Sequence, residues 1–438
     1  MGVLKNSVLV FLVLIILPSC ATVPFARVDG PLGSGDYAES AALIEKNKKK
    51  LYKNRDAILY YLDKGLVTHY AGQYQDSSNL LEEGERAIEA AFTKSVTAEI
   101  GSYIVNDTVK EYDGEDYEDI YLNVFNALNY YHRLDIEGAM VEIRRMNNKI
   151  QFLASKYGII TSNLQKKALE ESTAIPPDPN GDAHFSDSAL ARYLGLLFYR
   201  GTGRFDDARI DRDQLKIAFA NAPDIYTHPL PSSINDELEI PDGKARLNVL
   251  AFGGLSPAKE ETTLRVSLSA SNYVKIALPV LVERPSRIKR VELVIENGET
   301  FELELLEDLE KVARETFKEK EQVIYLKTIL RATMKGLTSS ALDAAASSDK
   351  VDGSTSLILS LLSIGNKIFS EASEQADLRI SRYFPGKAYI GGINLDPGTY
   401  SFTVNYRDAS GQALASFRQE NIMVYKDRLN LLEAVCLK

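Results

Sequence analysis

Residues 62–84 have the sequence LDKGLVTHYAGQYQDSSNLLEEG, in which small and aromatic residues recur at the spacing of a helical hairpin. Gly65 and Gly72 lie seven residues apart, and Tyr74 follows two residues later. In tetratricopeptide-type repeats, small residues at such positions let two antiparallel helices approach, and an aromatic residue closes the turn. The stretch therefore predicts a pair of closely packed helices.

The same pattern recurs twice further along the chain. The second copy comprises Ala127, Tyr130, Ile136, Ala139 and Ile143, and the third Leu196, Tyr199, Gly203, Phe205 and Ala208. The copies lie more than 60 residues apart, whereas the standard tetratricopeptide period is about 34. They form either a degenerate array with further helices between the recognisable pairs, or unrelated helical hairpins that share packing requirements. In both cases each pair buries its apolar stripe only against its neighbours.

Hydrophobic periodicity divides the chain into two halves of different class. Apolar residues three and four apart indicate helices over residues 37–222. Several prolines follow in 223–243, and short alternating runs typical of strands fill much of 244–438. We therefore expect an α+β protein of more than one domain. A tetratricopeptide-like helical array would be joined by a Pro-rich linker to a mostly antiparallel β-domain.

Two helices are expected to interrupt the β-domain as a helical hairpin at about 306–382. Asn297-Gly298 predicts a hairpin turn between two strands. Asp396-Pro397-Gly398 predicts a second turn, with the glycine in a positive-φ conformation. The strands are expected at residues 246–252, 263–268, 273–282, 290–295, 300–305, 387–393, 399–406 and 413–425.

The N-terminus has the features of an export signal. Lys5 precedes an unbroken apolar run over residues 8–17, and Pro-Ser-Cys20 follows. The run is about ten residues long, whereas roughly 20 are needed to span a bilayer. Residues 1–19 therefore predict a secretory signal peptide. The stretch ending at Cys20 resembles the lipobox of bacterial lipoproteins, in which the cysteine is acylated and becomes the first residue.

The resemblance implies that Cys20 is the lipidation site and that the protein is anchored to a membrane, because two or more acyl chains make anchoring durable. Residues 20–36 contain glycines and prolines and predict a flexible tether. Ala21, rather than aspartate, follows the cysteine, which in enteric-like sorting points to the outer membrane, facing the periplasm. The inner membrane is the alternative. An ordinary secreted protein cut elsewhere, or an uncleaved anchor, also remains open.

Composition narrows the class of partner. The formal net charge is -10, and no Lys/Arg run is long enough for a nucleic-acid footprint, so we expect no nucleic-acid partner. The chain has 2 cysteines. Lipidation would consume Cys20 and leave Cys436 without an intramolecular partner, so no disulfide framework is expected. The apolar neighbours of Cys436 predict a buried, inert thiol.

Motifs of catalysis are missing from the sequence. It contains no G-x-S-x-G, no G-x-x-x-x-G-K-[ST], no H-E-x-x-H and no paired C-x-x-C. The four histidines, His69, His132, His184 and His228, lie far apart without metal-ligand spacing. His69 and His132, in repeat helices, are expected to be structural, whereas His184 lies in a Pro-rich loop and is the least constrained. We therefore predict no catalytic residues, no metal and no cofactor.

The acidic stretch 113–119 leads into a predicted helix and is the best candidate for a recognition edge, because loops before helices tend to be accessible. The facing helix of the same pair carries two arginines, which would border one groove with the carboxylates. The candidate partner-binding residues are Tyr112, Glu115, Asp116, Tyr117, Arg144 and Arg145. Alternatively, the carboxylates cap the helix and favour the positive end of its dipole.

Several stretches together carry a family resemblance. They are the stretch ending at Cys20, Val-Asn-Asp at 105–107, YDGEDYE at 112–118, ALNY at 127–130, EGAMVEIRR at 137–145 and LDPGTY at 395–400. With them the chain looks like a family of uncharacterised bacterial lipoproteins with tetratricopeptide-like N-terminal halves. The resemblance implies no activity. A weaker association places such proteins beside envelope lipoproteins that activate peptidoglycan synthases.

Three functions follow as expectations. The first is a membrane-anchored scaffold whose helical array binds an envelope protein, in cell-envelope or peptidoglycan assembly. The second is an envelope glycan-binding protein or hydrolase with its site on the β-domain loops. The third is a structural envelope component that acts by self-assembly.

Overall fold

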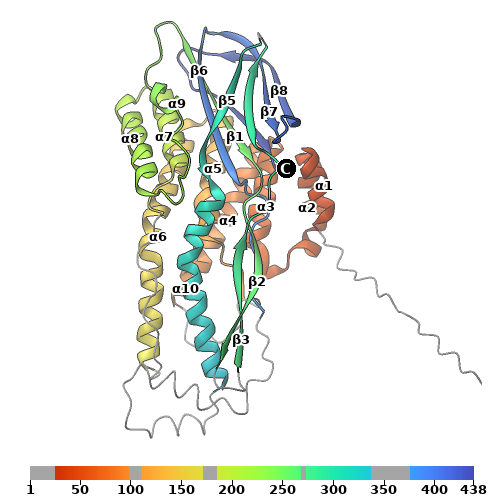
Figure 1. The fold of residues 1–438 in the computed structure, drawn as a ribbon, viewed down its shortest axis with the longest axis vertical. Helices are drawn as coiled ribbons and strands as arrows, with labels where there is room; N and C mark the ends of the chain where they lie inside the picture. The colour runs from red at the N-terminus through yellow and green to blue at the C-terminus, as the bar shows by residue number, and fades with distance from the viewer. Residues whose placement is uncertain are drawn as a thin grey trace, which may run out of the picture.

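The structure is a computed structural model that describes residues 25–97, 108, 110–170, 185–267, 273–296, 298–336 and 375–438. Helices form most of the N-terminal half and strands most of the C-terminal half (Figure 1). The expected mixture of helices and strands, in this order, is therefore confirmed. Cys20, His184 and the stretch 105–107 lie outside the described residues.

The helical half consists largely of consecutive helices joined by short turns. Three pairs, α3–α4, α5–α6 and α7–α8, pack along their lengths, at the three places where the sequence pattern recurs. The helices are α1 (Ala26–Ser34), α2 (Tyr37–Leu51), α3 (Ala57–Tyr70), α4 (Tyr74–Thr97), α5 (Asp116–His132), α6 (Ile136–Glu170), α7 (Ala189–Gly201), α8 (Phe205–Asn221) and α9 (Ser233–Asp236), with a 3₁₀ turn over Asn54–Asp56.

The three pairs share one turn. Each turn has a single left-handed residue in its middle: Gly72 at φ 73°, Leu134 at φ 64° and Gly203 at φ 75°. In the first turn the Gln73 N–H donates to the Thr68 carbonyl at 3.0 Å, and equivalent bonds close the other two at 2.9 and 2.8 Å. This is the bonding of a helix C-cap with a left-handed residue. The same turn joins α1 and α2, where Gly35 has φ 89° and the Asp36 N–H donates to the Pro31 carbonyl at 2.9 Å. The described part of the chain therefore contains this turn at least four times, while membership of the tetratricopeptide class stays a prediction.

Gly65→Ala is expected to lower the free energy of unfolding by about 1–3 kcal/mol through overpacking. A Cβ at position 65 would lie 2.7 Å from Leu81 Cδ2, so either the buried Leu81 side chain would have to shift or α3 and α4 would have to separate. Urea unfolding measures the effect. Gly33→Ala in α1 is the matched control, because a Cβ there meets no heavy atom within 4 Å and alanine favours a helix. Equal midpoints for the two variants would show that Gly65 is not a close contact.

The strand half contains a seven-stranded sheet in the order β8-β7-β4-β5-β6-β1-β9, and a separate β2–β3 ladder. All neighbours in the sheet are antiparallel except β1 and β9, which are parallel. The last strand was not among the predicted ones. The elements are β1 (Ala245–Gly253), β2 (Ala258–Ser267), β3 (Tyr273–Val282), β4 (Arg290–Ile295), β5 (Thr300–Asp308), α10 (Leu309–Gly336), β6 (Lys387–Leu395), β7 (Gly398–Arg407), β8 (Ala413–Val424) and β9 (Asn430–Cys436).

The two halves share a hydrophobic core. Phe125 on α5 lies 5.1 Å from Phe252 on β1 and 6.0 Å from Phe384, measured between ring centroids. The larger cluster of buried residues contains side chains from the helices and from the sheet, and a second cluster consists mainly of strand residues. The proline-rich residues 223–243 therefore do not separate two independent cores, contrary to the expected linker between domains.

The predicted tether is wrong for residues 26–34. This segment forms α1, in which Val28 and Leu32 are buried one turn apart. Ser40 in α2 donates a hydrogen bond to the Val28 carbonyl at 3.1 Å. Burial of this short apolar stripe outweighs the presence of Pro31 inside the helix, since tertiary packing supplies most helical stability.

The predicted interruption of the sheet is confirmed for its first helix, α10. Residues 337–374 lie outside the described residues, and 375–382 are not helical, contrary to the predicted second helix. The Asp396-Pro397-Gly398 turn joins β6 and β7, which are not neighbours in the sheet. Gly398 does not adopt a positive φ, so that detail of the turn prediction is wrong. Gly398 instead begins β7 and pairs with Val424.

Three long elements extend from the body toward the same end of the molecule: α6, α10 and the β2–β3 ladder (Figure 1). Helix α10 contacts both α6 and β3 along this extension. The start of α5 lies against α10, so the acidic stretch before α5 is placed where the extension leaves the body.

Candidate functional site

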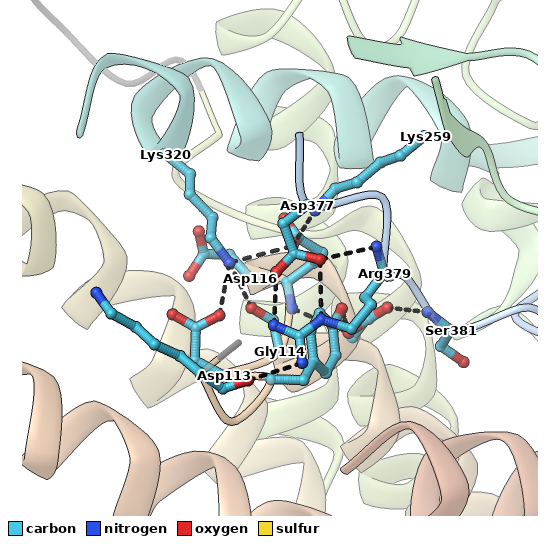
Figure 2. Close-up of polar contacts among 12 residues, drawn as sticks. Asp113, Gly114, Asp116, Lys259, Lys320, Asp377, Arg379 and Ser381 are labelled. Atoms are coloured by element: carbon cyan, nitrogen blue, oxygen red, sulfur yellow. Dashed lines mark hydrogen bonds and ion pairs between the residues drawn. The ribbon is translucent and has the colours of Figure 1, made fainter. Parts of the chain in front are cut away.

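The predicted recognition residues at the start of α5 are buried. Tyr112, Glu115, Asp116 and Tyr117 are each no more than 6 % exposed. The expectation of an accessible edge is therefore wrong for these four side chains. The edge is not accessible because residues far away in the sequence cover the acidic stretch and neutralise its charge (Figure 2).

Two lysines from other parts of the chain hold Glu115. Lys259 of β2 donates to Glu115 Oε1 at 2.6 Å, and Lys320 of α10 donates to the same oxygen at 3.1 Å. Lys320 also reaches Asp113 Oδ1 at 3.1 Å and the Gly114 carbonyl at 2.6 Å (Figure 2). The ammonium groups therefore tie the start of α5 to α10 and β2.

Asp116 and Tyr117 are likewise held inside the protein. Asp116 accepts hydrogen bonds from Lys156 and from the Tyr157 hydroxyl, both on α6. The Tyr117 hydroxyl lies 3.3 Å from Ser256 Oγ. Substitutions at these positions would test folding rather than recognition.

Glu118, within the acidic stretch, provides the helix cap. Its Oε2 accepts the backbone N–H of Glu115 at 2.9 Å, as expected if the carboxylates cap the helix, and the Tyr112 hydroxyl at 2.7 Å. Oε1 accepts the backbone N–H of Ser381 at 2.5 Å. Burial, with a smaller contribution from Glu115, raises the pKa of Glu118 from 4.5 to about 7. Asp63 accepts the Ser381 hydroxyl at 2.7 Å, so the two carboxylates fix the segment that follows the undescribed residues 337–374.

Glu118 is expected to make the protein less stable as the pH rises from 4.5 to about 7. In this range the folded protein holds a proton on Glu118 that the unfolded chain has released, because the folded pKa is the higher one. The free energy of unfolding should therefore fall across this window, by roughly 3 kcal/mol for a pKa rise of this size. Urea unfolding at a series of pH values measures the slope.

Glu118→Gln removes the titrating group and should reduce that slope. Asp63, whose pKa burial raises from 3.8 to about 6, contributes a slope of the same sign in both proteins. The difference between the two slopes therefore isolates Glu118. Parallel pH profiles for the wild type and the variant would contradict the assignment.

The two predicted arginines lie on α6, away from this buried cluster. Both are exposed, and Arg144 has no ion-pair partner in the described part of the chain. Arg145 pairs with Glu142 on its own helix at 2.9 Å and with Glu85 on α4 at 3.3 Å. The predicted groove bordered by these arginines and all four buried residues is therefore not formed.

Arg145 instead lines a hollow between α4 and α6, both of which pack along α5. The hollow has a volume of about 750 Å³. We call it the acidic hollow, because five of its charged residues are carboxylates and three are cations: Glu82, Glu85, Glu89, Asp135, Glu142, Arg86, Arg145 and Lys149.

A second hollow of about 350 Å³ lies beside it, where α10 joins α4, α5 and α6. Asp116 from the predicted set lines it, together with Asp113, Lys156 and Lys320. The rest of its wall is mainly apolar, and we call it the apolar hollow. Its principal apolar residues are Ile88, Phe92, Ile120, Phe152, Leu153 and Val323.

The two hollows form one groove, which we call the α4–α6 groove. Glu89, Asn148 and Lys149 line both hollows. The α6 wall of the groove is a stripe at helical spacing, Val141, Arg145, Asn148 and Phe152, in which Phe152 is 42 % and Val141 38 % exposed. Large apolar side chains on an otherwise polar helix face were the available sequence signal for this groove, but only the fold shows that α4 and α10 lie opposite.

Internal pairing accounts for much of the charge in the groove. Lys149 lies 2.7 Å from Glu85 and 2.7 Å from Asp119. Burial opposes ionisation of Glu85, but Lys149 outweighs it and brings the pKa of Glu85 below its ordinary value. By contrast, the exposed Glu89 has no ion-pair partner among the described residues. The exposed Asp135, which accepts the Gly138 N–H at 2.8 Å, likewise has no ion-pair partner among the described residues. Available negative charge therefore lies at Glu89, at the junction of the two hollows, and at Asp135, at the start of α6.

The histidines within the described residues have structural contacts, as expected for those in repeat helices. His69 on α3 and His132 on α5 both bond to Glu433 of β9, each at 2.7 Å. His228 Nε2 lies 3.2 Å from the Leu306 carbonyl. Among the described residues, no group of three or more His, Cys, Asp and Glu side chains could hold a metal ion.

Comparisons of the chain with protein-family models, with curated proteins and with solved structures found no match. None of the described helices is both long enough and apolar enough to cross a membrane. Cys436 is buried and its thiol is free, and burial raises its pKa, which agrees with the expectation of an inert thiol.

Proposed function

We propose that the protein is a lipid-anchored scaffold of the bacterial outer membrane that faces the periplasm and binds an envelope protein along the α4–α6 groove. The observation that carries the proposal is this groove, in which the apolar hollow, with the exposed Phe152 in its wall, adjoins the acidic hollow. Its function would lie in cell-envelope or peptidoglycan assembly, the direction that the family resemblance gives.

The composition of the groove supports a protein partner. Aromatic residues and arginine are enriched at protein–protein interfaces, and Phe92, Phe152 and Arg145 all line this groove. The recess between helices that pack on a common third helix also suits a helical segment of a partner. In the described residues no nucleophile, base and orienting group are placed together in this groove as a catalytic set.

Cys20→Ser is expected to release the protein from membranes, because the thiol is the proposed point of acylation and durable anchoring needs acyl chains. Fractionation of cells that express the wild type or the variant, with labelled fatty acid, measures both attachment and acylation. Cys436→Ser is the matched control and should leave both unchanged. A Cys20→Ser protein that stays with the membrane, together with an unlabelled wild type, would rule out the lipid anchor.

Partner binding can be tested with a photo-crosslinking amino acid in intact cells. Placed at Phe152 in the groove, it is expected to capture a discrete envelope protein. Placed at Ile217, which is 46 % exposed on α8 and outside the groove, it should not. Equal capture from both positions, or none from Phe152, would contradict a binding site in the groove.

A further inference from the structure

The α4–α6 groove has two adjoining halves of different chemistry, the apolar hollow and the acidic hollow. We propose that its occupant is an amphipathic helix of the partner, which places an apolar side chain in the apolar hollow and a lysine or arginine beside Glu89. The inference rests on the proposed scaffold function and specifies the partner's chemistry.

The exposed part of the groove fits a short helix. The α6 lining of the two hollows runs from Gly138 to Tyr157, and its exposed stripe runs from Val141 to Phe152, over which eleven residues of helix rise by about 16 Å. A partner helix of about three turns would therefore cover this stripe and reach into both hollows. Helices pack with their axes 8–10 Å apart, so the recess that α4 and α6 leave over α5 is of the kind that another helix fills.

The apolar hollow provides the place for an anchoring side chain. Phe92 and Phe152 meet edge to face, with ring centroids 5.5 Å apart, across α4 and α6. Ile88, Leu153 and Val323 are buried around them, while Phe152 remains exposed at the opening. An aliphatic or aromatic side chain of the partner would remove this apolar surface from water, which is the favourable change in most associations.

The acidic hollow selects the charge of the partner. Its five carboxylates exceed its three cations, and Arg145 and Lys149 are already paired with Glu85 and Glu142 inside the wall. Glu89 keeps an exposed carboxylate without a partner among the described residues. A basic side chain placed here gains an ion pair, whereas an acidic one meets an excess of negative charge.

The position of Glu89 fixes the order of groups on the partner. Because Glu89 lines both hollows, whereas Asp135 lines only the acidic hollow, a basic side chain that pairs with Glu89 lies next to the apolar anchor. On a helix, side chains three or four residues apart are neighbours on one face. The partner therefore carries an apolar anchor with a lysine or arginine three or four residues away.

A designed peptide pair tests this chemistry with the full-length protein. The first is a fluorescent 12-residue helical peptide with leucines on one face and lysines three and four residues from them. The second has glutamate in place of every lysine. Fluorescence anisotropy is expected to show binding of the lysine peptide, at least tenfold weaker binding of the glutamate peptide, and weaker lysine-peptide binding at high salt.

Charge reversal in the groove provides the matched variants. Glu89→Lys is expected to weaken binding of the lysine peptide roughly tenfold or more. Glu137 is also exposed but lies outside both hollows, so Glu137→Lys should leave the affinity for this peptide unchanged. Circular dichroism checks that both variants are folded. Equal affinities for the two peptides, or an equal effect of the two variants, would overturn the inference.

Two further outcomes separate this inference from the proposed function. If the crosslinker at position 152 captures an envelope protein but Glu89→Lys does not reduce the capture, the scaffold function stands and the basic helix is rejected. If the crosslinker instead joins to residues 337–374 of the same chain, the groove is filled from within the protein, and the partner helix is rejected.

Discussion

Replacing Glu237 by alanine is expected to lower the free energy of unfolding by about 3–5 kcal/mol, the cost of leaving buried charges without their partner. The Glu237 side chain is fully buried between Arg200 of α7 and Arg246 of β1. Arg246 donates to it at 2.9 Å, Asn248 donates at 2.9 Å, and Arg200 forms a further ion pair. Without the carboxylate, two guanidinium groups would remain in the interior of the protein.

Glu237 and its two arginine partners join the helical half to the sheet, so the substitution should destabilise both halves. Urea unfolding followed by far-UV circular dichroism measures the change, and Glu239→Ala is the control because Glu239 is exposed two residues away. Substitutions at such surface positions usually change stability by less than 0.5 kcal/mol. A loss below about 1 kcal/mol for Glu237→Ala would mean that the arginines find other partners or water.

Local patterns in the sequence predicted much of the fold. The pattern around Gly65 and Gly72, with its two later copies, marked three helical hairpins, because close packing and a left-handed turn demand particular residues at fixed spacing. It did not mark the hairpin that α1 and α2 form around Gly35. Leu134 occupies the equivalent turn position without being glycine, which shows that the fold tolerates a strained residue there. Alternating apolar residues likewise located most strands, since side chains in a strand point to opposite faces.

The predictions were wrong for segments whose burial or secondary structure depends on residues far away in the sequence. Lys259 lies 144 residues from Glu115, and Ser381 lies 263 residues from Glu118, so no local pattern could reveal these contacts. The acidic stretch was therefore interpreted as accessible, because loops before helices tend to be accessible. The predicted tether was wrong for the same reason, because burial of Val28 depends on α2 rather than on the composition of α1.

The candidate site was only partly predictable. The sequence selected Asp116 and Arg145, which the structure places on the walls of the two adjoining hollows. It missed Glu89 and Phe152, because a glutamate on a polar helix face and a single phenylalanine have no distinctive spacing. Their importance follows from the packing of α4, α6 and α10 around α5, which periodicity within one helix does not determine.

Glu433→Gln is expected to lower the free energy of unfolding by about 3 kcal/mol or more at pH 6, because it removes a buried partner of two histidines. Glu433 points from β9 to the helical half, where its Oε1 lies 2.7 Å from His69 Nε2 and its Oε2 lies 2.7 Å from His132 Nε2. His69 Nδ1 lies 2.7 Å from Asn129 Oδ1. The amide of Asn129 donates to Ser77 Oγ at 2.9 Å, so its oxygen is the atom that faces His69.

Both ring nitrogens of His69 therefore face oxygen acceptors, which favours the doubly protonated ring. Burial opposes a charge there, but Glu433 outweighs it and raises the pKa of His69 above 6.5. Burial would also raise the pKa of Glu433, whereas the two histidines bring it well below 4.5. The folded protein thus contains a charged pair that joins the last strand to the helices.

The pH dependence of this pair provides the sharper test. The contribution of His69 is fully present below pH 6.5 and is lost as the pH rises through its raised pKa. The contribution of Glu433 is present above pH 4.5 and is lost as the pH falls through its lowered pKa. The stability difference between the wild type and Glu433→Gln should therefore be largest between pH 4.5 and 6.5, and should shrink on both sides. Glu420→Gln, at an exposed position on β8, is the control, and a difference that does not change with pH would exclude the charged pair.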